Sequence, residues 1–259
     1  MKSKKETFAQ MMATSTYHYD LRSVFDDLLT MSLCALSYNP LTGKFHDEDL
    51  YMATVGKYQT SDFRFQFPKL FAQLVAEMEE RVDDSQGNDI LGAYFEQHLC
   101  RKNSGQFFTP FHICTFMAET LRDGSKDSSR RQRVLDPTCG SGRMLLAGSK
   151  SLGKDHEYYG IDVDHTCVKM AAINLFLNGV FHSEVMWADA LLPDDFHMSY
   201  RISFLPFGIF RIQHKEQSKL WHMYRNSFPE KKVVTKQPIV WPSQTSERHS
   251  GDGSQLKLF

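Results

Sequence analysis

Apolar residues recur at helical spacing through the first hundred positions of the chain. Between 21 and 33 they stand mostly three or four residues apart, and two further amphipathic runs cover 67–82 and 90–99. The Asn-Pro-Leu-Thr-Gly string at 39–43 predicts a turn between the first two helices. This pattern predicts that residues 1–104 form a helical N-terminal subdomain, most simply one without chemistry of its own.

From about residue 105 the pattern changes to short apolar runs that alternate with amphipathic ones. The predicted strands cover 133–136, 158–162, 184–187 and 200–205, and the predicted helices cover 144–150 and 166–178. Alternation of this kind is typical of an α/β fold with a parallel, doubly wound sheet that binds ligands at the carboxyl ends of its strands. We expect this core to span residues 105–228.

The last stretch of the chain, residues 229–259, is rich in Ser, Gln, Lys and Gly, and it contains almost no apolar residue between 243 and 254. Segments that cannot bury apolar surface stay disordered. We therefore expect a flexible tail, which ends in a short apolar string at 255–259.

Composition narrows the class of protein only slightly. The formal net charge of −1 gives no overall sign of nucleic-acid binding, although a local basic groove can exist in a neutral protein. The five cysteines are scattered without CxxC spacing, which indicates reduced thiols rather than a zinc site or a disulfide framework. No apolar run reaches membrane-spanning length, and the N-terminus lacks a secretory signal. These features together predict a cytoplasmic protein that does not enter a membrane.

The richest segment is the strand end and glycine turn at 134–142, Val-Leu-Asp-Pro-Thr-Cys-Gly-Ser-Gly. Glycines at 140 and 142 allow the backbone to approach a ligand closely. Such a turn also fits a dinucleotide site, but the third glycine of that motif is absent because position 145 is Leu. Asp136 at the strand tip would repel a phosphate, whereas it could accept hydrogen bonds from an ammonium group.

Two further acids follow at the tips of the next two predicted strands. Asp162 ends the second strand, where a carboxylate can bind the hydroxyls of a ribose, and Asp189 follows the third, where it could accept from an adenine amino group. Each acid alone is more often a turn or cap residue. Three at consecutive strand tips favour a pocket for an adenosine-type cofactor with a charged amino group.

The Gly-Gln-Phe-Phe-Thr-Pro segment at 105–110, followed by Asp-Pro-Thr-Cys-Gly-Ser-Gly at 136–142, resembles the adenine-N6 DNA methylases related to type I restriction-modification methylase subunits. The resemblance spans roughly residues 88–210. It implies a Rossmann-like methyltransferase fold that binds S-adenosylmethionine. The cofactor-binding residues that it implies are Phe108, Thr109, Asp136, Pro137, Gly140, Gly142, Asp162 and Asp189.

The family's catalytic motif, Asn-Pro-Pro followed by Phe or Tyr, is degenerate in this chain. The corresponding segment is Ser-Phe-Leu-Pro-Phe-Gly at 203–208, in which Pro206 and Phe207 match while Phe204 stands at the Asn position. By resemblance, Phe207 would stack on a flipped base. A phenylalanine cannot accept the hydrogen bond that orients the target amino group. Either the chain binds cofactor without methylating DNA bases by the usual route, or neighbouring groups such as Ser203 substitute.

A basic stretch with interleaved aromatic residues runs from Arg211 to Lys232. Such a mixture can hold a nucleic-acid backbone and stack bases. More often it is an amphipathic helix packed on its own domain. Little chain remains after it for a target-recognition domain, so a partner such as a specificity subunit would have to supply DNA sequence recognition.

The chain ends in a Gln-Leu-x-Leu-Phe string, which resembles the peptide by which bacterial DNA-processing proteins bind the replication sliding clamp. Its partner-binding residues would be Gln255, Leu256, Leu258 and Phe259. Short peptides with alternate apolar side chains can fill a preformed groove. A chance apolar terminus, or a strand that docks on its own domain, is the alternative.

Two functions therefore remain open. The first is methyl transfer from S-adenosylmethionine to adenine in DNA, in a restriction-modification or mobile-element setting. The second is an inactive cofactor-binding adaptor that the sliding clamp recruits to DNA. Methylation of protein or RNA is less favoured, because the segment at 105–110 points to the DNA family.

Overall fold

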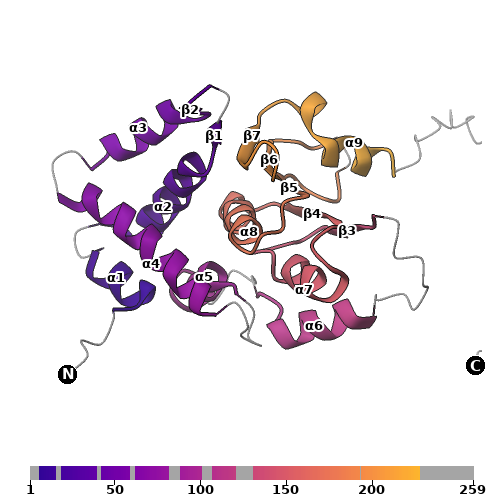
Figure 1. The fold of residues 1–259 in the computed structure, drawn as a ribbon, viewed down its shortest axis with the longest axis horizontal. Coiled ribbons are helices and arrows are strands. Elements are labelled where there is room, and N and C mark those ends of the chain that lie inside the picture. The colour runs from indigo at the N-terminus through magenta and orange to yellow at the C-terminus, as the bar shows by residue number, and fades with distance from the viewer. Residues whose placement is uncertain are drawn as a thin grey trace, which may run out of the picture. The chain divides into compact units, whose positions relative to one another are not determined.

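The first half of the chain folds into helices that pack beside a five-stranded sheet formed by the second half (Figure 1). The computed structural model describes residues 6–15, 19–39, 42–58, 62–81, 88–100, 107–120, 131–192 and 194–227. By its contacts the chain divides after residue 228, and the residues beyond that point lie outside the described ones. None of the described helices is long and apolar enough to cross a membrane.

The three helices expected from periodicity are present. They are α2 (Leu21–Ala35), α4 (Gln66–Glu80) and α5 (Ile90–His98). The carboxylates of Asp20 and Asp89 cap α2 and α5 by accepting from backbone N–H groups three residues on. The remaining elements of this region are α1 (Phe8–Ser15), the β1–β2 hairpin (Tyr38–Asn39 and Lys44–Phe45), α3 (Glu48–Gly56) and the 3₁₀ helix η1 (Asp62–Phe65).

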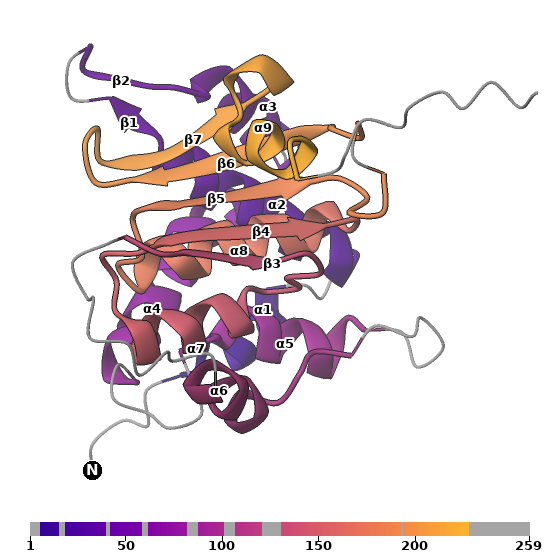
Figure 2. The ribbon, with the colours of Figure 1, turned by 90° about the vertical axis from the view of Figure 1, so that its right-hand side faces the viewer.

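The second half confirms the expected α/β fold class. Its sheet has the order β3-β4-β5-β6-β7 (Figure 2). The strands are β3 (Arg133–Asp136), β4 (Glu157–Asp162), β5 (Ser183–Trp187), β6 (Met198–Ser203) and β7 (Gly208–Ile212). The helices are α6 (Phe111–Thr120), α7 (Arg143–Leu152), α8 (His165–Leu177), the 3₁₀ helix η2 (Lys215–Gln217) and α9 (Lys219–Arg225).

The sheet is mixed rather than wholly parallel. Strands β3, β4 and β5 run parallel, with crossovers through α7 and α8, but β6 is antiparallel to β5 and β7 is antiparallel to β6. The expectation that the strand near 200–205 continues the parallel sheet is therefore wrong. Parallel neighbours need a crossover of about a dozen residues or more. The ten-residue connection from Ala188 to His197 turns the chain back instead.

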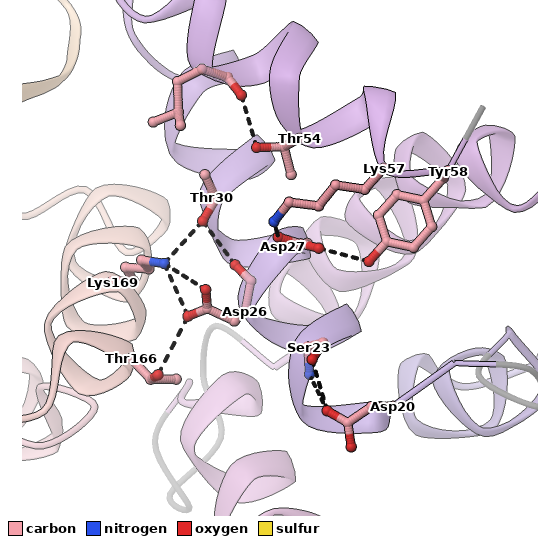
Figure 3. Close-up of polar contacts among 11 residues, drawn as sticks. Asp20, Ser23, Asp26, Asp27, Thr30, Thr54, Lys57, Tyr58, Thr166 and Lys169 are labelled. Carbon is pink, nitrogen blue, oxygen red and sulfur yellow. Dashed lines mark hydrogen bonds and ion pairs between the residues drawn. The ribbon is translucent and has the colours of Figure 1, made fainter.

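Helix α8 lies at the centre of the hydrophobic core, which extends without a break from the N-terminal helices to the sheet. On one side α8 contacts β4, β5 and β6, and on the other it contacts α2. The buried Lys169 of α8 forms an ion pair with Asp26 of α2 at 2.9 Å and also donates to Thr30 (Figure 3). The helical region therefore forms part of the same folded unit as the sheet.

Helix α9 covers part of the opposite face of the sheet, which Figure 2 shows toward the viewer. Its Leu220 and Trp221 are buried against Tyr159, Ile161 and Met186. This second cluster is much smaller than the core around α8. The carboxyl edge of β3, β4 and β5 lies between the two packed faces, and it carries the acids singled out in the sequence.

Candidate functional site

The three predicted acids lie along the carboxyl edge of the parallel strands. Asp136 is the last residue of β3 and Asp162 is the last of β4. Asp189 lies two residues beyond Trp187, which ends β5 and pairs with Asp162. The parallel register therefore brings all three carboxylates to one edge, as the spacing of the strands predicts.

The turn after β3 has the backbone geometry that its two glycines allow. Gly140 and Gly142 have φ values of 53° and 88°, in the left-handed region that side chains rarely adopt. The turn is fixed to the neighbouring strand, because Cys139 donates its backbone N–H to the carbonyl of Ile161 at 2.9 Å. The N–H of Gly140 is bonded to the carboxylate of Asp162 at 2.8 Å.

Phe108 lies directly over this turn. A Cβ atom built on Gly140 would stand 3.0 Å from the Phe108 ring, so a side chain at that position would have to displace it. The same ring stacks on Phe95 of α5 at 5.8 Å between centroids, and the Arg143 guanidinium lies 5.3 Å from its centre. These contacts hold Phe108, just upstream of α6, against the glycine turn.

The two other predicted cofactor residues of these segments, Thr109 and Pro137, are exposed. Thr109 precedes α6, and its carbonyl accepts from the Cys114 thiol at 3.5 Å. Pro137 directly follows Asp136. Both stand next to residues that face the turn, and neither is fixed by a side-chain contact to it among the described residues.

Burial raises the pKa of the Asp136 carboxyl, and the nearby Asp162 raises it further, while a hydrogen bond from the Thr138 N–H opposes both. Burial also raises the pKa of Asp162 above its usual range, although the N–H groups of Gly140 and Asp164 partly offset this effect. Two partly desolvated carboxylates of like charge favour a cation beside them. The site is therefore electrostatically suited to a positively charged ligand.

Asp189 occupies a different local setting. Its carboxylate accepts from the Leu191 N–H at 2.9 Å, and its own N–H donates to Asp195 at 2.6 Å. It thus forms the turn that leads from β5 into the connection to β6. Its carboxylate oxygens each have two acceptor positions, so this turn leaves capacity for a ligand amino group.

A buried network adjoining the glycine turn was not anticipated from the sequence. Asp89, which caps α5, accepts from Ser141, Arg143 and Asn174, residues that lie 52, 54 and 85 positions further along the chain. The only local signal was an aspartate before an apolar helical run, which is typical of an N-cap. Nothing in such a pattern indicates a contact with the glycine turn.

The predicted catalytic segment lies at the opposite edge of the sheet. Pro206 and Phe207 belong to the four-residue turn between β6 and β7, and β6 ends beside Ser183, where β5 begins. The acids and this turn are separated by the length of a strand, about 15–20 Å. Because β6 runs antiparallel to β5, the turn that carries Pro206 and Phe207 lies at the edge opposite to the predicted cofactor-binding residues.

The aromatic residues of this turn pack on Phe176 of α8 and on Phe181. The Phe207 ring contacts Phe176 and Phe181, with centroids 4.9 and 5.5 Å apart, and Phe204 contacts Phe181 at 5.5 Å. Leu205, next to the cis peptide of Pro206, is exposed. In this position the ring of Phe207 covers the end of α8.

The described part of the basic stretch packs on its own domain, as the simpler interpretation held. Lys219 and Arg225, at the two ends of α9, form ion pairs with Glu157 and Asp194, and Trp221 is buried. Arg211 of β7 is bonded to Asp47 at 2.6 Å. The string at 255–259 lies outside the described residues. Among the residues that the structure describes, no group of His, Cys, Asp and Glu side chains could hold a metal ion.

The family model for N-6 DNA methylases matches residues 86–235, which include the glycine turn, all three acids and the upstream Phe108. The match covers more than half of the chain. The chain belongs to the N-6 DNA methylase family. The expected relationship is thereby confirmed.

Relatives of this member of the N-6 DNA methylase family include subunits of restriction enzymes. Over 193 residues it is 26% identical to the type I restriction enzyme MpnII methylase subunit of Mycoplasma pneumoniae, which covers 70% of this chain and 35% of that protein. It is 28% identical over 145 residues to the type II restriction enzyme and methyltransferase RM.BcgI of Heyndrickxia coagulans, covering 49% and 22% of the two chains. A type I HindI methylase subunit of Haemophilus influenzae is 32% identical over 104 residues, covering 36% and 22%.

The chain thus spans about a third or less of the length of these relatives. No solved structure matches it. Membership in the family makes this chain similar to DNA methyltransferases.

Proposed function

We propose that this protein binds S-adenosylmethionine at the carboxyl edge of β3, β4 and β5. The observation that carries the proposal is the close approach of Phe108 to Gly140, in the turn that links the two partly desolvated carboxylates of Asp136 and Asp162. S-adenosylmethionine carries an ammonium and a sulfonium, and it also has a ribose and an adenine. The acids and the glycine turn offer partners for each of these groups.

The residues present fit such a cofactor. Asp136 would accept from the ammonium group, and Asp162, which keeps free lone pairs beside its two backbone bonds, would accept from the ribose hydroxyls. Asp189 would accept from the adenine amino group. Gly140 and Gly142 would leave room for close approach of the ligand to the backbone, and Phe108 with Thr109 would exclude water at the methionine end.

When bound, the cofactor supplies an activated methyl group, and family membership makes adenine N6 in DNA the proposed acceptor. Catalysis of this transfer is largely positioning of the acceptor nitrogen. The aromatic turn at 204–207 cannot position a base against this pocket, because it lies a strand's length away. We therefore propose that the described fold binds the cofactor and that groups outside it, such as a specificity or second methylase subunit, complete the acceptor site.

Calorimetry and a transfer assay on the purified chain test this function. S-adenosylmethionine should bind with one site per chain, whereas methylation of unmethylated duplex DNA with labelled cofactor should be undetectable for the chain alone. Absence of binding would refute the cofactor proposal. Robust formation of N6-methyladenine by the isolated chain would refute the claim that the acceptor site is incomplete.

The C-terminal string at 255–259 supports a second proposal of a different class, recruitment to DNA by the bacterial sliding clamp. The support is its sequence alone, a Gln-Leu-x-Leu-Phe peptide at the end of a polar tail. Deletion of these five residues should abolish binding to immobilised clamp, while a Lys257→Ala control should retain it. Equal binding by the deletion variant and the intact chain would exclude this role.

A further inference from the structure

One buried carboxylate joins the helical region to the cofactor turn. Asp89, at the start of α5, is 6% exposed and accepts four hydrogen bonds. Its Oδ1 accepts from the Gly92 N–H and from Asn174 Nδ2, both at 2.7 Å. Its Oδ2 accepts from Ser141 Oγ and Arg143 Nε, both at 2.6 Å. All four donors surround one carboxylate, and the positive charge of Arg143 balances its negative charge.

One of these bonds, together with a bond from Asn174, acts directly on the glycine turn. Ser141 stands between Gly140 and Gly142, the two residues with left-handed backbone. Asp89 accepts from the Ser141 hydroxyl, and Asn174 donates to the Ser141 carbonyl at 2.9 Å. Since glycine has no side-chain preference to maintain such a conformation, fixing the residue between them restricts both neighbouring peptide planes. The turn is then held by Asp162 on one side and by Asp89 and Asn174 on the other.

The bond from Arg143 to Asp89 helps to place the aromatic side chain over the turn. The Arg143 guanidinium is anchored by Asp89 and by Glu96, the latter at 3.1 Å, and its planar group faces the Phe108 ring. Phe108 also stacks on Phe95 of the same helix. Helix α5 therefore carries both the anchor of Arg143 and the stacking partner of Phe108.

The close approach of α5 to the glycine turn requires a glycine at position 92. A Cβ atom on Gly92 would stand 2.1 Å from an Asp89 carboxylate oxygen and 2.3 Å from Ser141 Oγ. The glycine thus permits α5 to approach the turn closely enough for Asp89 to reach it. An ordinary N-cap needs no such space, because its bond to the third residue is local.

The geometry points to Asp89 as a positioning residue for cofactor binding, one that acts through Ser141 and Arg143 rather than by contact with the ligand. This inference rests on the proposed binding of S-adenosylmethionine. It assigns to the first helical region, for which the sequence suggested no chemistry, a direct part in shaping the pocket. Loss of the Asp89 charge should release the turn and Phe108 together.

Asp89→Asn tests the inference with Asp27→Asn as its matched control. Asp27 is equally buried at 6% and is also paired, with Lys57 at 2.6 Å and Tyr58 at 2.7 Å, but its partners lie within the helical region (Figure 3). The expected result is a rise of about tenfold or more in the Kd for S-adenosylmethionine for Asp89→Asn, as for loss of a charged hydrogen bond. Asp27→Asn should stay within about twofold of the wild type while losing thermal stability.

A readout independent of the ligand distinguishes positioning from mere stabilisation. The chain has fifteen glycines, so ¹⁵N-glycine labelling gives a spectrum simple enough to assign by substitution. The amide signals of Gly140 and Gly142 should shift in Asp89→Asn without cofactor and stay in place in Asp27→Asn. Unmoved signals together with unchanged affinity would overturn the inference, as would equal effects of the two substitutions.

Ser141→Ala provides a milder variant if Asp89→Asn does not fold. It removes one bond to Asp89 and leaves the ion pair with Arg143 intact, so it should shift the same two amide signals and weaken binding to a smaller degree. A wild-type spectrum and affinity in this variant would count against the inference. If the wild-type chain binds no cofactor, the proposed function fails, whereas the glycine signals still decide whether Asp89 positions the turn.

Discussion

The carboxylate of Asp162 accepts a hydrogen bond from the backbone N–H of Gly140 at 2.8 Å. Because Asp162 ends β4 and Gly140 lies in the turn that follows β3, this bond connects the tips of two neighbouring strands. The residue proposed to bind the ribose is therefore also a support of the turn proposed to bind the methionine part. The two halves of the pocket should respond together when Asp162 is changed.

The first prediction concerns that carboxylate. Asp162→Asn keeps the size of the side chain but removes its charge, and the Kd for S-adenosylmethionine should rise about tenfold or more because a charged acceptor is lost. Asp155→Asn is the control, since Asp155 is an exposed residue ahead of β4 at the opposite edge. If calorimetry gives the same affinity for both variants, Asp162 does not take part in cofactor binding.

The second prediction separates backbone strain from steric contact at the turn. Gly140→Ala places a Cβ atom 3.0 Å from the Phe108 ring at a φ of 53°, whereas Gly43→Ala has a similar φ of 67° with no atom within 4 Å. Both variants should lose about 1–3 kcal/mol of unfolding free energy from strain. Only Gly140→Ala should also weaken cofactor binding. Denaturant unfolding and calorimetry measure the two effects, and normal binding by Gly140→Ala would contradict the close-approach argument.

Local patterns were sufficient to predict much of this edge of the sheet. Apolar runs that end in an acid located the tips of β3 and β4, and parallel register then brings Asp136 and Asp162 together. The direction of β6 was not predictable in this way, because an isolated strand looks the same in either orientation. The short connection before it, ten residues from Ala188 to His197, was the available signal.

The contacts of Asp89 show a second limit. Its partners Ser141 and Arg143 are more than fifty positions away, so only the packing of α5 on the turn brings them together. Sequence periodicity records which face of a helix is apolar, but it does not record which polar residues meet across an interface. A buried charge becomes recognisable only when its partners and its exposure are known.

The third prediction tests the position of the turn at 204–207, which lies at the edge of the sheet opposite to the three acids. Phe207→Ala removes a ring that packs on Phe176 and Phe181, so it should lower the unfolding free energy by about 1–3 kcal/mol, because Phe207 is only half-buried. Its affinity for S-adenosylmethionine should equal that of the wild type, since the turn is at the opposite edge. Val163→Ala is the control. It changes an exposed apolar residue next to Asp162, at the proposed cofactor site. Weaker cofactor binding in Phe207→Ala alone would contradict the observed strand order.

The fourth prediction follows from His165, which begins α8. Its imidazole stacks on Trp187 with centroids 4.4 Å apart, and one ring nitrogen lies 3.2 Å from the Tyr200 hydroxyl. Burial lowers the pKa of His165 from 6.5 to about 4, and the nearby Lys169 acts in the same direction. The folded protein therefore keeps this ring neutral at pH values where the unfolded chain already takes up a proton.

The sign of the resulting pH dependence is fixed by that difference. As the pH falls from 6.5 toward 4, protonation of the unfolded chain lowers the unfolding free energy, by at most about 3 kcal/mol. The His165 contribution is fully present above pH 6.5 and lost below pH 4. His165→Phe keeps an aromatic ring against Trp187 but cannot titrate. Urea unfolding at pH 7 and pH 5 should therefore show a smaller loss of stability on acidification for the variant than for the wild type, and equal losses would mean that His165 is not held neutral by its burial.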